Sequence, residues 1–185
     1  MGELNLVIGP MYSGKSTELL RIYNKYKIKY NILVINHISD NRYGENNIYT
    51  HNKDSINCIS FLNLFEFYNY YNHKEIEKFD VILIDEGQFF NDLYGFCKDV
   101  VEIEKKIVYV FGLSGDFKRN IFGEILYLMP IADNIKHLKS ICYNCTDLKE
   151  APFTMRKNSN TEQVLVGGEE DYIAVCRECW LKQIN

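Results

Sequence analysis

The chain has 185 residues, a hydrophobic fraction of 46% and a formal net charge of −4 at pH 7. This length suits one domain, or one domain with a small appendage, and the composition is that of a globular protein with a buried core. The acidic balance, with a pI near 5.6, argues against a basic surface that binds nucleic acid. No apolar run is long enough to span a membrane, and a predicted strand begins too early to leave room for a signal peptide. We therefore expect a cytoplasmic protein with no membrane partner.

Four apolar segments predict buried strands, and helical patterns lie between them. The predicted strands cover residues 4–8, 32–36, 81–85 and 107–113, which are apolar on both faces, as in a parallel sheet covered by helices. Helices are expected over residues 17–30, 61–71 and 89–105, and over 121–134, where Pro130 would kink or end the helix. The third of these carries a predicted buried stripe of Leu93, Phe96, Val100 and Ile103. Residues 40–57 are polar and predict a loop. The alternation of strands and helices predicts an α/β fold.

The segment between the first strand and the first helix carries the most informative motif. Residues 9–16 read GPMYSGKS, which fits the phosphate-binding pattern G-x-x-x-x-G-K-[ST]. The glycines let backbone N–H groups approach phosphate oxygens, Lys15 supplies a positive charge, and Ser16 offers a hydroxyl to the Mg²⁺ that accompanies ATP. A chance match is the alternative, and the position between a strand and a helix argues against it. We predict an ATP-binding parallel sheet of the P-loop NTPase type.

The third predicted strand ends in two carboxylates, Asp85 and Glu86. An apolar strand that finishes in Asp is the Walker B arrangement, which places Asp85 near Mg²⁺, directly or through water. Ligands bind outside the carboxyl ends of parallel strands, where these groups emerge. Glu86 is then a candidate general base for an attacking hydroxyl or water. The alternative is a solvated residue at a strand end.

Two arginines are candidates for stabilising phosphate charge. Arg42 follows the second predicted strand, and Arg119 follows the fourth. An arginine can neutralise the charge of a transferring phosphoryl group. Isolated arginines are more often surface charges, so this alternative stays open for both.

Two C-x-x-C pairs, Cys142 with Cys145 and Cys176 with Cys179, predict a metal site. Four thiolates complete a tetrahedral structural Zn²⁺ site, one per chain. Disulfides are disfavoured in a reducing cytosol, and a redox C-x-x-C would need a thioredoxin-like context. About thirty residues separate the pairs, so the segment between them must extend away from the metal site and return to it.

The pattern of the sequence changes near residue 139, where helical periodicity ends and the cysteine pairs begin. We place a domain boundary there, with an ATP-binding α/β domain over 1–139 and a small zinc-binding domain over 140–185. The remaining cysteines, Cys58 and Cys97, lie in apolar surroundings and are predicted to be buried packing residues.

Taken in order, these motifs resemble those of type II thymidine kinases, the cellular and poxvirus class. The resemblance covers nearly the whole chain. The segments that carry it are Gly9 to Leu19, Asp40 to Tyr43, Tyr49 to His51, Asp85 to Phe90, Gly112 to Gly123, Cys142 with Cys145, Val166 to Gly168 with Tyr172, and Cys176 with Cys179.

The resemblance implies transfer of the γ-phosphoryl group of ATP to the 5′-hydroxyl of thymidine, with Glu86 as the base and Mg²⁺ held by Ser16 and Asp85. The ATP phosphates would be bound by Gly9, Pro10, Met11, Tyr12, Ser13, Gly14, Lys15, Ser16, Thr17, Arg42, Asp85 and Gln88. Thymidine would be bound by Met11, Phe89, Leu113, Phe117, Phe122, Thr154, Val166, Gly167, Gly168 and Tyr172. The segment between the cysteine pairs would be the family's lasso, a loop that closes over the nucleoside. Its backbone near Val166 to Gly168 would hold the base, Thr154 would lie near the 5-methyl group, and Tyr172 would reach the ribose.

The resemblance also implies a homotetramer with feedback inhibition by dTTP, and it leaves open the roles of Ser114, Asp116 and Arg119. Two other classes of protein compete with this interpretation. A zinc-bearing ATPase or helicase fragment would need a basic groove, which the acidic pI disfavours. A zinc-ribbon interaction module with a decayed nucleotide site is disfavoured by the intact Lys15 and Glu86.

Overall fold

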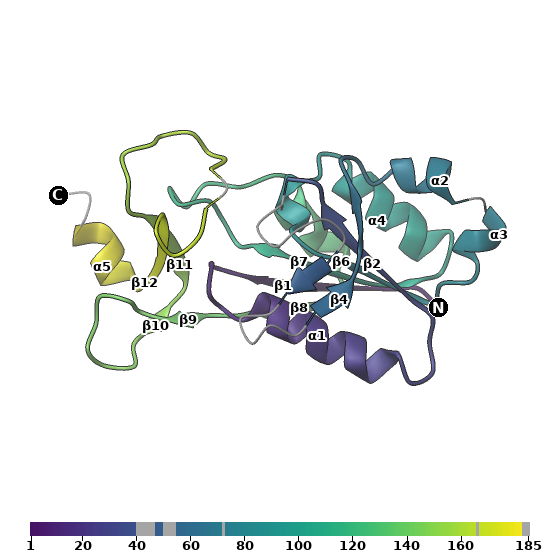
Figure 1. Cartoon of the computed structure of the whole chain (residues 1–185), viewed down its shortest axis with the longest axis horizontal. Coiled ribbons are helices and arrows are strands. Elements are labelled where there is room, and N and C mark those ends of the chain that lie inside the picture. Colours follow the sequence, from purple (N-terminus) through teal and green to yellow (C-terminus); the bar gives the residue numbers. More distant parts are fainter. Residues whose placement is uncertain (40–46, 50–54, 72, 166, 183–185) are drawn as a thin grey trace.

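The computed structural model describes residues 1–39, 47–49, 55–71, 73–165 and 167–182. Its main element is a six-stranded sheet in the order β5-β2-β6-β7-β1-β8, in which all neighbouring strands are parallel. The strands are β1 (Glu3–Gly9), β2 (Ile32–His37), β5 (Ile59–Phe61), β6 (Val81–Ile84), β7 (Ile107–Leu113) and β8 (Asn134–His137). The predicted α/β fold with a parallel sheet is confirmed (Figure 1).

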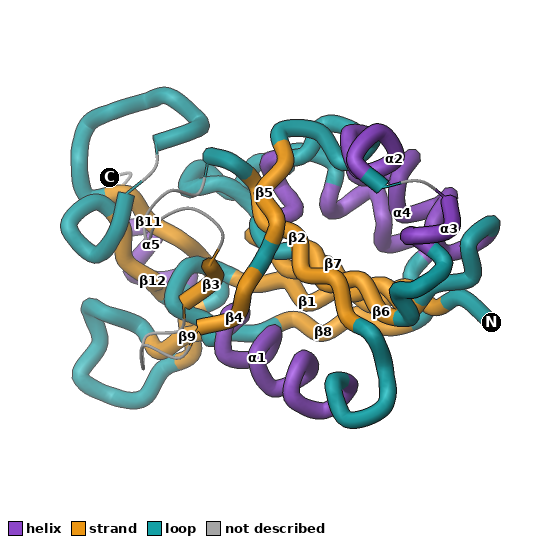
Figure 2. The backbone as a smooth tube through the Cα atoms, turned by 45° about the vertical axis from the view of Figure 1, so that its right-hand side comes forward, coloured by secondary structure: helices purple, strands orange, loops and turns teal. Residues whose placement is uncertain are grey.

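Helices cover both faces of this sheet. In Figures 1 and 2, α1 (Lys15–Tyr26) lies on one side, while α2 (Glu66–Tyr70), α3 (His73–Ile76) and α4 (Leu93–Glu102) lie on the other. Side chains of one strand alternate between the faces: Val34 packs in the cluster of Leu19 and Ile22 from α1, whereas Ile35 packs in the cluster of Phe96 from α4. Burial on both faces explains why the central strands are continuously apolar in sequence. Within the described residues, no helix combines the length and apolar character needed to cross a membrane.

Several boundaries differ from the prediction, mainly at the edges of the sheet. β5 ends at Phe61, the first residue of the segment predicted as a helix over 61–71; a turn follows, and α2 begins only at Glu66. The segment 121–134 forms a 3₁₀ helix, η2 (Ile125–Ile131), with Pro130 inside it, and leads into β8, every residue of which is exposed. β5 escaped prediction because it has only three residues, and β8 because it lacks the apolar run of a central strand.

Two further predictions need correction. Ile103 is 69% exposed, because α4 ends at Glu102, one residue before it. The other three residues of the predicted stripe are buried. The segment predicted as a loop contains an antiparallel pair, β3 (Asn47–Tyr49) and β4 (Ser55–Asn57). Ile48 and Ile56 of this pair join the hydrophobic cluster on the α1 side of the sheet.

The C-terminal region lies beyond the carboxyl ends of the parallel strands (Figure 1). It contains β9 (Ser140–Ile141), β10 (Glu150–Ala151), β11 (Phe153–Arg156), β12 (Tyr172–Val175) and α5 (Arg177–Lys182), with β9 paired to β10 and β11 to β12. Its own small core includes Met155, Val175 and Trp180. The Trp180 indole donates a hydrogen bond of 3.2 Å to the carbonyl oxygen of Phe117, which attaches α5 to the segment after β7.

Candidate active site

A cavity of about 410 Å³ lies between the carboxyl ends of β1, β6 and β7 and the C-terminal region. Most residues that the sequence predicted for ATP and thymidine line it: Met11, Tyr12, Ser13, Gly14, Lys15, Ser16, Thr17, Asp85, Glu86, Gln88, Phe89, Leu113, Phe117, Phe122, Thr154, Gly167, Gly168 and Tyr172. Gly9 and Pro10 belong to the phosphate-binding loop but do not line the cavity. Arg42 and Val166 lie outside the described residues.

The phosphate-binding loop connects β1 to α1, as the motif predicted. Gly14, directly before α1, has a φ of +83°, a left-handed conformation that glycine adopts without a steric cost. The Lys15 ammonium donates hydrogen bonds to the carbonyl oxygens of Pro10 (2.8 Å) and Gly9 (3.4 Å). The Ser13 hydroxyl donates to the same Pro10 carbonyl at 2.8 Å. The loop therefore holds the positive charge of the Lys15 ammonium at the N-terminus of α1, where the helix dipole also favours an anion.

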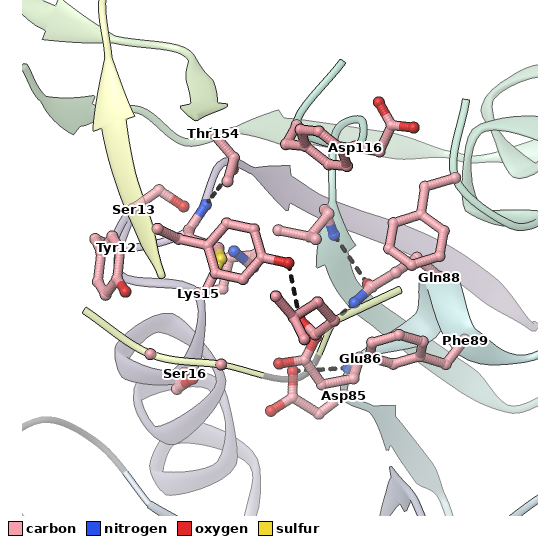
Figure 3. A pocket seen from close by; sticks show the side chains of 18 of the residues that line it. Tyr12, Ser13, Lys15, Ser16, Asp85, Glu86, Gln88, Phe89, Asp116 and Thr154 are labelled. Carbon is pink, nitrogen blue, oxygen red and sulfur yellow. Dashed lines mark hydrogen bonds between the residues drawn. The ribbon is translucent and has the colours of Figure 1, made fainter. Parts of the chain in front are cut away.

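The two carboxylates that follow β6 face the same cavity. Asp85 is 5% exposed, and its Oδ1 accepts a hydrogen bond of 3.0 Å from the backbone N–H of Glu86. Glu86 has a φ of +51°, in the left-handed region that residues with a Cβ seldom adopt. This turn leads the chain out of the sheet into the 3₁₀ helix η1 (Gly87–Phe89). In Figure 3, Glu86 lies across the view from Ser13.

Gln88 connects Glu86 to the end of β7. Its Nε2 donates a hydrogen bond of 2.6 Å to Glu86 Oε2, and its Oε1 accepts one of 3.0 Å from the backbone N–H of Leu113. Because a backbone N–H can only donate, this contact fixes which end of the amide faces Glu86. A Cβ at Gly112 would lie 2.5 Å from Gln88 Oε1, so glycine makes room for the connection. Gln88 was predicted to bind phosphate; it lines the cavity, but both ends of its amide are engaged with Glu86 and Leu113.

Aromatic rings form the apolar part of the cavity wall. Phe89 and Phe122 meet edge to face, with ring centroids 5.4 Å apart. Phe117 lies under the Arg156 guanidinium, whose central carbon is 3.8 Å from the ring centroid. An apolar wall with a few polar groups is typical of a site for a small molecule.

Residues of the C-terminal region complete the cavity. The Thr154 hydroxyl accepts a hydrogen bond of 3.0 Å from the backbone N–H of Met11, which joins β11 to the phosphate-binding loop (Figure 3). Tyr172 is 6% exposed, and its hydroxyl donates to the Leu165 carbonyl at 2.8 Å and accepts from Arg156. Tyr172 therefore lines the cavity with a hydroxyl that also organises the loop between β11 and β12.

The residues whose roles the sequence left open lie in different places. Arg119 is not among the described residues that line the cavity; its guanidinium lies 3.5 Å from the Trp180 ring centroid. The backbone N–H of Ser114 donates to the Gly9 carbonyl at 3.2 Å. Asp116 is buried and lines the cavity. The other lining residues were not predicted individually, although five of them lie in the segment between the cysteine pairs; they are Ser39, Ile48, Gln163, Val164, Leu165, Glu169 and Glu170.

The four paired cysteines come together in the C-terminal region, as predicted. Their sulfur atoms all lie within 4.8 Å of one another. Cys145 Sγ is 3.9 Å from Cys176 Sγ and 3.6 Å from Cys179 Sγ, close to the edge of about 3.8 Å that a tetrahedron with Zn–S distances of ~2.3 Å requires. Burial raises the pKa of Cys142, but hydrogen bonds, chiefly from the backbone N–H groups of Cys176 and Asn144, outweigh it and leave this pKa at about 7. The spacing of the four sulfur atoms suits a bound metal ion.

The two remaining cysteines are buried, as predicted. Cys97 lies on the buried face of α4, and burial raises its pKa well above the usual value for a thiol. A thiol that stays protonated in an apolar core is a packing residue and not a nucleophile.

Comparison with known proteins identifies the family. A family model described as thymidine kinase matches residues 2–180. The chain belongs to the thymidine kinase family. It is 39% identical over 180 residues to the thymidine kinase of sheeppox virus (strain KS-1), with 97% of each chain covered. It is 40% identical over 181 residues to that of vaccinia virus (strain Western Reserve), again with 97% of each chain covered. With the thymidine kinase of rice it shares 38% identity over 185 residues, which cover 97% of this chain and 66% of the rice protein.

The match to the thymidine kinase family spans both parts of the molecule. Residues 2–180 include the phosphate-binding loop, the carboxylates after β6 and the four clustered cysteines. The cavity described above therefore lies wholly within the thymidine kinase match.

Proposed function

We propose that this protein transfers the γ-phosphoryl group of ATP to the 5′-hydroxyl of thymidine and so produces dTMP. The observation that carries the proposal is the position of Glu86, which lines one cavity together with the phosphate-binding loop and a set of aromatic rings. Relatives named thymidine kinase, 39% and 40% identical to the chain, support the choice of substrate.

The chain's own residues supply the parts that phosphoryl transfer needs. Lys15 and the backbone N–H groups of the loop bind the ATP phosphates and stabilise their charge. Glu86 accepts the proton of the 5′-hydroxyl as that oxygen attacks the γ-phosphorus. Phe89, Phe117 and the other rings hold the base so that this hydroxyl points toward the loop. The segment between β11 and β12 excludes water, which would compete as an acceptor.

Two residues of the cavity suit Mg²⁺, and one further residue is proposed for the phosphates. The Ser16 hydroxyl and the Asp85 carboxylate both line the cavity, and such oxygens are the ligands that Mg²⁺ prefers. Mg²⁺ bound with ATP neutralises charge on the β- and γ-phosphates. Arg42 is proposed to stabilise the same phosphates by its place in the family motif.

We further propose that the four clustered cysteines hold one structural Zn²⁺, because four thiolates leave no open coordination position. A site of reduced thiolates suits the cytoplasm, where disulfides are rare. A zinc-binding unit over residues 140–185, a homotetramer and feedback inhibition by dTTP belong to the same proposal through the family resemblance.

One assay separates this function from its alternatives. ATP consumption is measured with thymidine, with deoxycytidine, with single-stranded DNA or with no acceptor. We expect thymidine to stimulate consumption strongly and single-stranded DNA to have no effect. Stimulation by DNA alone would indicate a nucleic-acid-dependent ATPase, and no consumption under any condition would indicate a binding module.

A further inference from the structure

The loop after β11 touches the segment after β7 through side chains. Gln163 Nε2 donates hydrogen bonds to Asp116 Oδ2 (2.9 Å) and to the carbonyl oxygen of Ile121 (3.2 Å). Close by, the Lys118 ammonium donates to the carbonyl oxygen of Thr161 at 2.8 Å. Both partners of Gln163 Nε2 are acceptors, so the amide nitrogen is the end that faces them. Gln163 and Asp116 both line the cavity.

Asp116 is held rigidly enough to act as a fixed attachment point. It is 5% exposed, and its Oδ1 accepts hydrogen bonds of 2.8 Å from the backbone N–H groups of both Lys118 and Asn120. Its second oxygen, Oδ2, is turned toward Gln163. A buried carboxylate needs such donors, because it has lost its water. The contact to Gln163 thus contributes to a charge-assisted network.

Arg156 holds the same loop from its inner side. Its guanidinium donates to the carbonyl oxygens of Asn160, Glu162 and Gln163 and to the Tyr172 hydroxyl. These contacts shape the loop, but they run between β11, β12 and the loop itself. The contacts made by Gln163 and Lys118 are different, because they tie the loop to the segment that follows β7.

We propose that Gln163 and Asp116 form a latch that keeps residues 157–165 against the cavity and so sets how long a nucleoside stays bound. Both are positioning residues: they act on the loop and not on the reacting atoms. The identity of the nucleoside as thymidine rests on the proposed function. A nucleoside enclosed by the loop can leave only when this contact opens, so weakening the contact raises the dissociation rate without disturbing the phosphate-binding loop.

The test uses Gln163→Glu, which keeps the shape of the side chain. It replaces the Nε2 amide group, which donates two hydrogen bonds, by a carboxylate oxygen that can only accept and that faces the buried carboxylate of Asp116. We expect thymidine to dissociate about tenfold faster and its KM to rise similarly, while kcat and the KM for ATP stay within about twofold. Adding Asp116→Asn to Gln163→Glu provides an amide donor opposite the new carboxylate, while its oxygen still serves the two backbone N–H groups. The double variant should return the dissociation rate to within about threefold of the wild type.

The matched control is Glu162→Gln, the reverse change at the adjacent, exposed residue, which should alter none of these values. Trypsin cleavage after Lys157 in the nucleoside-free protein gives a second readout, and Gln163→Glu should accelerate it. Unchanged thymidine dissociation and unchanged cleavage in a folded Gln163→Glu protein would overturn the latch and leave the proposed function standing. Faster cleavage in a protein that binds no thymidine would uphold the latch and refute the proposed function instead.

Discussion

The carboxylate of Glu86 and the backbone of Leu113 are joined through a single side chain, the amide of Gln88, by hydrogen bonds of 2.6 and 3.0 Å. Leu113 is the last residue of β7 and part of the cavity wall. The orientation of the proposed base is thereby tied to the wall against which the nucleoside would rest. A carboxylate held in this way needs little reorganisation to reach the 5′-hydroxyl.

The first prediction concerns Gln88. Gln88→Leu removes the donor to Glu86 and leaves the Leu113 N–H without its partner, so kcat should fall about 10- to 100-fold. The KM for ATP should stay within about twofold, because Lys15 and its loop are untouched. Steady-state kinetics with each substrate varied would check this. A large rise in the KM for ATP with unchanged kcat would mean that Gln88 binds phosphate.

The second prediction concerns Glu86 itself. Glu86→Gln should preserve thymidine binding and thermal stability, but kcat should fall by about 10²- to 10⁴-fold, because a general base is lost. Calorimetric titration with thymidine and a turnover assay separate the two effects. Glu102→Gln, an exposed change on α4, serves as the control. Retention of more than a third of the wild-type kcat would remove Glu86 from the mechanism.

The third prediction concerns the clustered cysteines. Elemental analysis of protein purified under reducing conditions should give one Zn²⁺ per chain. Cys145→Ser should lose the metal, and the region from β9 to α5 should become sensitive to protease before the sheet does, because metal binding and local folding are coupled there. Cys58→Ser, a change at a buried cysteine far from the cluster in sequence, should keep its zinc. Reduced wild-type protein without zinc would falsify this assignment.

The fourth prediction concerns Tyr172. Tyr172→Ala should raise the KM for thymidine roughly ten- to a hundredfold, because the aromatic ring in the cavity wall and the hydrogen bonds of its hydroxyl are lost. The KM for ATP should change little. Tyr172→Phe keeps the ring and should show a smaller rise. Equal weakening of both substrates would indicate that Tyr172 supports the fold and not the nucleoside site.

The fifth prediction concerns pH and the contact between α1 and β8. Hydrogen bonds from Arg21 and Lys136 lower the pKa of Glu18 from 4.5 to about 2, although burial opposes this. A carboxyl with a lowered pKa stabilises the fold above its unfolded-state pKa, and this contribution is lost as the pH falls from about 5 to about 2. Because Arg21 and Lys136 are 61% and 52% exposed, we expect only about 1 kcal/mol.

Urea unfolding of the wild type and of Glu18→Gln at pH 7 and at pH 2.5 would measure this contribution. The difference in the free energy of unfolding between the two proteins should shrink at the lower pH. A difference that is equal at both values would rule out the ionised carboxylate as its source.

Much of the fold could be predicted because its central strands are buried on both faces, so their sequences are continuously apolar. The edge strands could not: β5 has three residues, and β8 is exposed throughout. A short or solvated strand owes its place to hydrogen bonds with a neighbour distant in sequence, and a local pattern does not contain that neighbour. The pair of β3 and β4 escaped prediction because each strand has only three residues, too few to show an alternating pattern.

The candidate site could be predicted where the chemistry resides in a local motif, as in the phosphate-binding loop and the cysteine pairs. Contacts between distant loops could not be predicted. Gln163 and Asp116 are 47 positions apart, and neither belongs to a motif that names the other. The family resemblance implies that Gln88 binds phosphate, and the structure adds the contacts of its amide with Glu86 and Leu113, which the sequence alone does not reveal.

Transfer of the phosphoryl group can be followed directly with an isotopic label. Purified protein is incubated with Mg²⁺, thymidine and ATP labelled at the γ-phosphate, and the nucleoside products are separated and analysed. We predict that the label appears in dTMP, on the 5′-oxygen, at a rate that depends on both substrates and collapses in Glu86→Gln. Label that appears only as inorganic phosphate, or that reaches thymidine equally well in Glu86→Gln, would contradict the account.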